Sequence, residues 1–277
     1  MADVVAIHGI FMNHSSRRDM ETKWRNAMIR GLHNARFPGA DSLTFECAFY
    51  GHLYNDGKSV GDRTYQAADL ESGLEQELFI AIAEATDAND EEIHREGDSK
   101  LWLPNPIQRA VRRIERHKIL DGVSSKVIGL VKQVGRYFKD DDFAEAVREE
   151  LTQAMSEIPR VLVAHSLGSI IAYDWLRRQE QAAVPTLITI GSPLGFRGVR
   201  RALDPLMDTS PAAWPKVETW INVAADEDAV AIVKKLDGLY GGPVDDRLAH
   251  NTRMAAHSAV KYLENVHTSN ALKAALG

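Results

Sequence analysis

The sequence predicts an α/β fold, a mostly parallel sheet of about six strands with helices on both of its faces. Short apolar runs rich in β-branched residues recur along the chain, as expected of strands that are buried on both faces. Segments with helical spacing separate these runs, and strands that alternate with helices form a parallel sheet. The length of 277 residues suits a single domain of this class that carries an insertion.

The first elements are a strand, a helix and a further strand. Residues 4–7 form an apolar run that leads directly into a His-Gly pair, and a helix with one apolar face is expected over 17–33. Residues 43–50 alternate apolar and polar side chains, which predicts a strand toward an edge of the sheet. The single cysteine, Cys47, lies in this alternation, so we expect it to be buried, and an internal disulfide is excluded.

A long interval without a convincing strand, about residues 51–159, comes next. It follows the strand at 43–50. This strand is counted as the third here, because the strand at 160–164, which leads into the serine motif described below, is counted first. Helical patterns in the interval lie at 70–84, 106–120 and 124–138. A parallel crossover needs only one helix, and the pattern at 141–158 supplies it. We therefore expect residues 51–140 to be a helical cap inserted into a single domain, residues 1–277.

The second half of the chain continues the alternation of strands and helices. Strands are expected at 160–164, 186–190, 217–223 and, more weakly, 247–251, and two short helices at 258–265 and 269–276 end the chain. We expect the strands at 4–7 and 160–164 to flank the point where the winding direction of the sheet reverses. Ligands of open α/β sheets bind beyond the carboxyl ends of the strands at such a point.

Ser166 stands between the strand at 160–164 and a segment with helical spacing. Ala164 and Gly168 lie two residues before and two residues after it. Small residues at both positions relieve crowding in a sharp strand-to-helix turn, which leaves the serine hydroxyl exposed at the edge of the sheet. The alternative is that Ser166 only caps a helix that follows a core strand.

A serine hydroxyl becomes a nucleophile when a base takes its proton and a carboxylate orients that base. The acidic turn after a predicted strand offers Asp226 and Asp228 as the carboxylate. Three late histidines could supply the base, and they are His250, His257 and His267. We expect His250 to be packed within the weak last strand and His267 to lie beyond the following helix. His257 lies in the loop that opens that helix and is the favoured base.

Four motifs in this order resemble the α/β-hydrolase superfamily of serine esterases and lipases. They are His8-Gly9, Ala164-His165-Ser166-Leu167-Gly168, Asp228-Ala229-Val230 and His257-Ser258, and Gly191-Ser192-Pro193-Leu194 is also common in lipase-like members. The resemblance covers residues 3–50 and 141–272. It implies that Ser166 is the nucleophile, that His257 is the base and that Asp228, which precedes x-Val, is the acid.

The same resemblance implies an oxyanion hole made of two backbone N–H groups. One belongs to Leu167, after the nucleophile, and the other to Ile10, or else to Phe11, after the early His-Gly pair. His8 and His165 also stand in these motifs, but members of the superfamily often carry them without a catalytic role. We expect both histidines to be positional.

The chain departs from the superfamily pattern in three ways. Ala164 replaces the usual glycine of the serine motif, the usual first two strands are missing, and the insertion follows the third strand rather than the fifth. The place of the insertion makes it unsafe to infer a substrate from known caps.

The motifs together predict a carboxylic ester hydrolase that acts through an acyl-enzyme on a small-molecule or lipid ester. The alternatives are an amidase or acyltransferase that uses the same three residues, or a catalytically idle hydrolase fold used for binding. We expect no cofactor, because the chain has no phosphate-binding glycine loop. We expect no metal, because it has no His-Glu-x-x-His motif and no cysteine pair.

Charge and hydropathy indicate which partners and which cellular location to expect. The net charge of -6 gives no reason to expect nucleic-acid binding. The chain shows neither a signal-peptide pattern nor an apolar stretch of membrane-spanning length, so we expect a cytoplasmic protein. Residues 98–139 carry ten Lys or Arg and three Asp or Glu, a local excess of +7, beside an apolar stripe. This basic part of the cap predicts peripheral membrane contact or steering of anionic substrates. The alternative is that it only packs against the core and faces acidic segments at 84–98 and 140–150.

Overall fold

The structure is a computed structural model that describes residues 2–10, 16–54, 65–88, 106–116, 123–181, 183–208, 211–252 and 255–277. It contains one all-parallel sheet of six strands in the order β2-β1-β3-β4-β5-β6. The strands are β1 (Val4–Ile7), β2 (Phe45–Ala48), β3 (Val161–His165), β4 (Val184–Ile190), β5 (Val217–Ala225) and β6 (Val244–Ala249). The predicted α/β fold is therefore confirmed.

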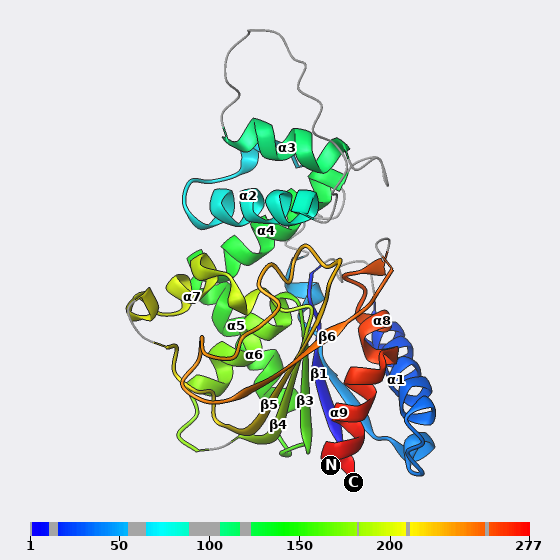
Figure 1. The fold of residues 1–277 in the computed structure, drawn as a ribbon. Helices are drawn as coiled ribbons and strands as arrows, with labels where there is room; N and C mark the ends of the chain where they lie inside the picture. Colours follow the sequence, from blue (N-terminus) through cyan, green and yellow to red (C-terminus); the bar gives the residue numbers. More distant parts are fainter. Residues whose placement is uncertain are drawn as a thin grey trace, which may run out of the picture.

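Helices separate the strands along the chain up to β5, and the described segment between β5 and β6 contains no helix (Figure 1). They are α1 (Arg17–Asn34), α2 (Leu74–Ala88), α3 (Pro106–Arg116), α4 (Val123–Lys139), α5 (Asp141–Ala154), α6 (Leu167–Arg177), α7 (Arg197–Leu203), α8 (Ala259–Glu264) and α9 (Val266–Leu276). Short 3₁₀ helices lie at Ala40–Ser42, Gly51–Tyr54, Ala67–Asp69, Pro193–Gly195 and Pro205–Asp208. Side-chain caps define several helix starts: Ser16, Asp140 and Ser258 each accept a backbone N–H of the first turn.

The two faces of the sheet bury two apolar cores. Val4 and Ala6 of β1 face the core formed with α1, α8 and α9. Val5 and Ile7 alternate to the opposite face, where α5 and α6 pack. Helices therefore cover both faces, with α1 and α9 on one side and α5 and α6 on the other (Figure 1). Cys47 of β2 is fully buried, as its alternation predicts.

The winding direction reverses between β1 and β3. The chain runs from β1 outward to β2 and then crosses to β3 on the other side of β1, where Ile7 is the register partner of Ala164. The carboxyl ends of β1 and β3 are thus neighbours, as expected from the sequence. The loops that follow both strands meet at the position where open α/β sheets bind ligands.

The last strand differs from its prediction. It spans β6 (Val244–Ala249), earlier than the expected 247–251, so His250 follows the strand, and its side chain is exposed rather than packed. The sequence of β6 is largely polar, so it lacks the regular apolar spacing from which a strand is predicted. Asp246 within it is a structural group, because its carboxylate accepts the backbone N–H groups of Leu236 and Asp237. Hydrogen bonds of this kind replace the apolar contacts that make other strands recognisable.

Helices α2, α3 and α4 lie in the chain between β2 and β3, and α2 and α3 extend beyond the sheet (Figure 1). The role of this segment as a cap stays a prediction. Its residues 55–64, 89–105 and 117–122, and with them part of the basic segment, lie outside the described residues. None of the helices in the described ranges is both long and apolar enough to cross a lipid bilayer.

Several described basic residues of this segment have acidic neighbours. Lys132 and Lys139 of α4 pair with Glu71 and Glu75, and Arg136 pairs with the Asp residue that caps α5. In the apolar stripe of α4, Leu130, Val131 and Val134 are buried in the core. These charges meet acidic residues of the same chain, two of which, Glu71 and Glu75, lie before the predicted acidic segments. Membrane contact by this segment stays a prediction.

Candidate active site

Ser166 occupies the sharp turn between β3 and α6. Its backbone has φ 54° and ψ -126°, a region that residues with a side chain rarely adopt. The turn is tight: a Cβ at Gly168 would lie 2.5 Å from the carbonyl oxygen of His8. Ser166 stands at the N-cap position of α6, yet its side chain makes no capping hydrogen bond. The alternative that this serine merely caps the helix is therefore wrong.

The Ser166 hydroxyl, His257 and Asp228 form one continuous hydrogen-bond chain. Oγ of Ser166 lies 2.9 Å from Nε2 of His257. On the other side of the ring, Nδ1 of His257 lies 2.8 Å from Oδ2 of Asp228 and 3.0 Å from Oδ1. The structure thus brings together the three residues that the sequence favoured, from the ends of β3 and β5 and from the loop before α8.

Asp228 is almost fully buried, and several donors surround its carboxylate. Tyr262 donates its hydroxyl to Oδ2 at 2.8 Å, and the backbone N–H of Val230 donates to Oδ1 at 2.9 Å. Burial by itself raises the pKa of this carboxyl, but the charge of His257 and the hydrogen bonds from His257, Tyr262 and Val230 outweigh burial. The pKa therefore lies below its usual value, and Asp228 is ionised and able to orient a protonated imidazole.

The second acidic candidate, Asp226, pairs with a different histidine. Its Oδ2 lies 2.5 Å from Nδ1 of His250, and this pair is largely exposed, with side-chain exposures of 39% for Asp226 and 79% for His250. His267, the third histidine considered, lies in α9, where its carbonyl accepts a hydrogen bond from Arg247. In the described structure only His257 joins the hydroxyl of Ser166 to a buried carboxylate.

Two residues to which the sequence analysis gave no role, Tyr262 and Gly191, lie against Asp228 and His257. Tyr262 lies below Asp228, in α8, which begins directly after the His257-Ser258 pair. Gly191, after β4, has φ 57° and approaches both groups: a Cβ there would lie 2.9 Å from Oδ2 of Asp228 and 3.2 Å from Nδ1 of His257. Gly191 was noted as part of a motif, but only the tertiary contact shows why a side chain is excluded there.

The two backbone segments named for an oxyanion hole flank Ser166. Leu167 is the first residue of α6, and the N–H groups of a first helical turn have no acceptor within the helix. The loop after β1 lies against the serine, because a Cβ at Gly9 would stand 3.2 Å from Oγ of Ser166. Ile10 follows in this loop and is partly buried. Phe11, the alternative donor, lies outside the described residues.

His8 and His165 are buried beside the candidate active site and are held by backbone groups. The ring of His8 stacks on Tyr50 at 4.0 Å and accepts its backbone N–H, and burial lowers the pKa of His8 to about 4. Nε2 of His165 lies 3.1 Å from the carbonyl oxygen of His257, and burial together with the nearby His257 lowers the pKa of His165 to about 3. Both rings are neutral at pH 7 and support neighbouring backbone.

Among the described residues, no group of three or more His, Cys, Asp or Glu side chains is placed so that it could hold a metal ion. The arrangement around Ser166 has the parts that acyl transfer requires: a hydroxyl, an imidazole in contact with it, an ionised carboxylate and neighbouring backbone N–H groups.

Comparisons of the chain with protein-family models, with curated proteins and with solved structures gave no match.

Proposed function

We propose that this protein is a serine hydrolase of the α/β-hydrolase type that cleaves carboxylic esters through an acyl-enzyme. The observation that carries the proposal is the chain of hydrogen bonds from Ser166 Oγ through His257 to the buried carboxylate of Asp228. Its position at the carboxyl ends of β1, β3 and β5 adds support, because ligands of open α/β sheets bind at that edge.

In the proposed reaction Ser166 attacks the ester carbonyl while His257 takes its proton through Nε2. Asp228 holds the imidazole in the required orientation and stabilises its protonated form. His257 then gives the proton to the leaving alcohol, and a water molecule activated by the same histidine releases the acyl group. Backbone N–H groups of Leu167 and Ile10 would stabilise the negative charge on the carbonyl oxygen.

The backbone of Ser166 favours this proposal over a catalytically idle fold used for binding. Strained conformations at non-glycine residues cost of the order of 1–3 kcal/mol and concentrate at functional positions. Here the strain directs the hydroxyl to Nε2 of His257, which a binding role does not require. An amidase or an acyltransferase would use the same three residues and differs only in the leaving group or the acceptor.

Fluorophosphonate labelling of the purified chain is the direct test, because only an activated serine reacts with such a probe. We expect one label per chain, located on Ser166 by mass spectrometry, and none in Ser166→Ala or after denaturation. His257→Ala should also stop labelling, whereas His250→Ala is the matched control and should label normally. A native chain that stays unlabelled would overturn the proposal.

Turnover then separates the reaction classes. We expect loss of the nucleophile or the base to lower kcat by roughly 10⁴- to 10⁶-fold, since the three residues act as a unit. A panel of esters graded by acyl length and head-group charge, with matched amides and acceptor alcohols, identifies the preferred substrate. We place the activity in the cytoplasm as part of the same proposal. Cell fractionation tests this location.

A further inference from the structure

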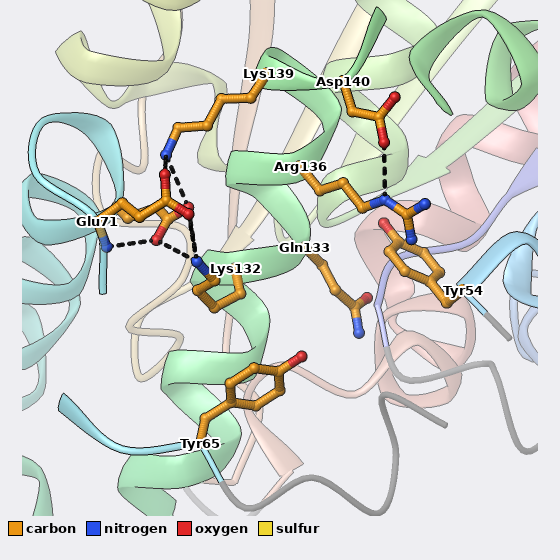
Figure 2. A pocket seen from close by; sticks show the side chains of 9 residues that line it. Tyr54, Tyr65, Glu71, Lys132, Gln133, Arg136, Lys139 and Asp140 are labelled. Carbon is orange, nitrogen blue, oxygen red and sulfur yellow. Dashed lines mark hydrogen bonds and ion pairs between the residues drawn. The ribbon is translucent and has the colours of Figure 1, made fainter. Parts of the chain in front are cut away.

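A cavity of about 270 Å³ lies beside α4. Side chains of α4, among them Gln133 and Arg136, line one wall, and Tyr54 and Tyr65 line another (Figure 2). None of the three side chains of the candidate active site lines this cavity. Its volume is at the small end of the range for ligand cavities, which suits a molecule with a single ring.

Gln133 marks this cavity as a binding site. The residue is 2% exposed, and neither its amide oxygen nor its amide nitrogen has a hydrogen-bond partner in the described part of the chain. Its side chain projects from α4 toward the space between the rings of Tyr54 and Tyr65 (Figure 2). Buried polar groups of native proteins are nearly always paired, and an amide offers an acceptor oxygen beside a donor NH₂ group. The Gln133 amide thus lacks the hydrogen-bond partner that an occupant of the cavity would supply.

The aromatic wall is held in place by its neighbours. The ring of Tyr54, which is 3% exposed, packs against Phe143 at a centroid distance of 4.9 Å. Its hydroxyl, like the Gln133 amide, has no partner among the described residues. Tyr65 is fixed to α4, because its backbone N–H donates to Oγ of Ser125 at 2.9 Å. The cavity therefore combines a fixed aromatic wall with two buried polar side chains that lack partners, and charged residues make up the rest of its lining.

The charged groups of the wall are already paired. Nζ of Lys132 and of Lys139 each bind the carboxylates of Glu71 and Glu75, at distances of 2.8 to 3.1 Å. Nε of Arg136 lies 3.3 Å from the carboxylate that caps α5. Each described cation of the lining thus has a carboxylate partner. An ionic ligand would bring a charge that the cavity does not compensate.

We propose that this cavity binds an uncharged small molecule that carries a carboxamide group on an aromatic ring. The carboxamide would donate to the oxygen and accept from the nitrogen of Gln133, and the ring would lie against Tyr54 and Tyr65. A carboxylate only accepts and an ammonium group only donates, so neither completes this pair of hydrogen bonds. The inference goes beyond the proposed ester hydrolysis and does not depend on it.

Isothermal titration of the full chain with benzamide tests the proposal. Benzoate and benzylamine have nearly the same shape but carry a negative and a positive charge. We expect benzamide to bind with a Kd of the order of 1 mM or tighter, as for a well-matched small fragment, and at least roughly tenfold more tightly than either charged analogue. Gln133→Leu keeps most of the volume and removes both amide atoms, and it should weaken benzamide binding by roughly tenfold or more.

Two controls separate this site from other effects. Gln153→Leu makes the same change on an exposed position of α5 and should leave binding unchanged. Ser166→Ala should also bind benzamide normally, so failure of the proposed hydrolysis and failure of this site are distinguishable. If Gln133→Leu does not fold, Tyr54→Phe is a second variant. It removes only the hydroxyl of Tyr54 and should weaken benzamide binding by a smaller factor than Gln133→Leu.

The proposal is overturned by any of three results. One is that benzamide fails to bind at millimolar concentration or binds no better than benzoate. Another is that its affinity is unchanged in both Gln133→Leu and Tyr54→Phe. The third is a crystal structure, determined with saturating benzamide, that shows only water molecules against Gln133.

Discussion

The hydroxyl of Tyr262 donates to Oδ2 of Asp228 over 2.8 Å, and the same hydroxyl accepts the backbone N–H of Ala225 at 2.7 Å. Tyr262 therefore ties the candidate acid to the end of the strand that carries it. Burial and the charge of Asp228 raise the pKa of this phenol well above its usual range, so it is a proton donor at neutral pH.

We expect Tyr262→Phe to lower kcat/KM for esters roughly tenfold, because Asp228 would lose one of the donors that fix its orientation. The variant should also lose about 1–3 kcal/mol of unfolding free energy, since the carboxylate of Asp228 and the backbone N–H of Ala225 would each lose one hydrogen bond. Tyr173→Phe is the matched control, because the hydroxyl of this buried tyrosine donates to the carbonyl of Ala213. Equal kcat/KM values for the two variants would contradict a positioning role for Tyr262.

The two acids should respond very differently to conversion to an amide. Asp228→Asn would hold His257 in the wrong tautomer and should lower kcat by about 10⁴-fold. Asp226→Asn changes the exposed pair with His250, so its kcat should stay within about threefold of the wild-type value. Steady-state kinetics of both variants on one ester measure the two losses in kcat. A larger loss in Asp226→Asn than in Asp228→Asn would assign the role of the acid to Asp226.

A methyl group at Gly191 should disturb the pair formed by Asp228 and His257. The added Cβ would lie 2.9 Å from Oδ2 of Asp228, and misplacement of catalytic groups by about 1 Å can cost roughly 100-fold in rate. Gly238→Ala controls for backbone strain, because Gly238 has φ 77° and no atoms within 4 Å of the added Cβ. We expect Gly191→Ala to lose roughly 100-fold in kcat/KM and Gly238→Ala to lose stability alone. Similar kinetic losses in both would show that strain, not contact with Asp228, is responsible.

The buried histidines should make the fold sensitive to acid. His8 has a pKa of about 4 in the folded chain because burial disfavours its charge, whereas an unfolded histidine has a pKa of roughly 6.5. Between these two values the unfolded chain binds a proton at this position and the folded chain does not. The unfolding free energy therefore falls as pH falls from about 6.5 to about 4, by up to about 1.4 kcal/mol per pH unit for this group.

Urea unfolding at a series of pH values measures this slope. His8→Gln should reduce it by about one proton across the same window, because glutamine can accept the N–H of Tyr50 without titrating. His33→Gln, an exposed histidine on α1, is the control and should leave the slope nearly unchanged. A slope that is identical in all three proteins would show that His8 does not contribute to acid sensitivity.

Much of the fold could be predicted because its signals are local. The strand at 4–7 and the serine motif have the apolar runs of central strands, and the observed β1 and β3 match them within a residue or two. The last strand, β6, was placed three residues late at its start, because Asp246 and its neighbours stabilise it through hydrogen bonds to a loop. Helix α7 was not expected, since its seven residues are too few to show a clear period.

The sequence by itself determined the α/β class, the turn that carries Ser166 and a short set of candidate partners, because each depends on the order and spacing of nearby residues. The tertiary structure decided which partners meet. Asp226 and Asp228 are two residues apart in one turn, yet Asp228 is buried against Tyr262 and faces His257, while Asp226 points outward to His250. That choice depends on how α8 packs beneath β5, a contact between distant segments that no local pattern encodes.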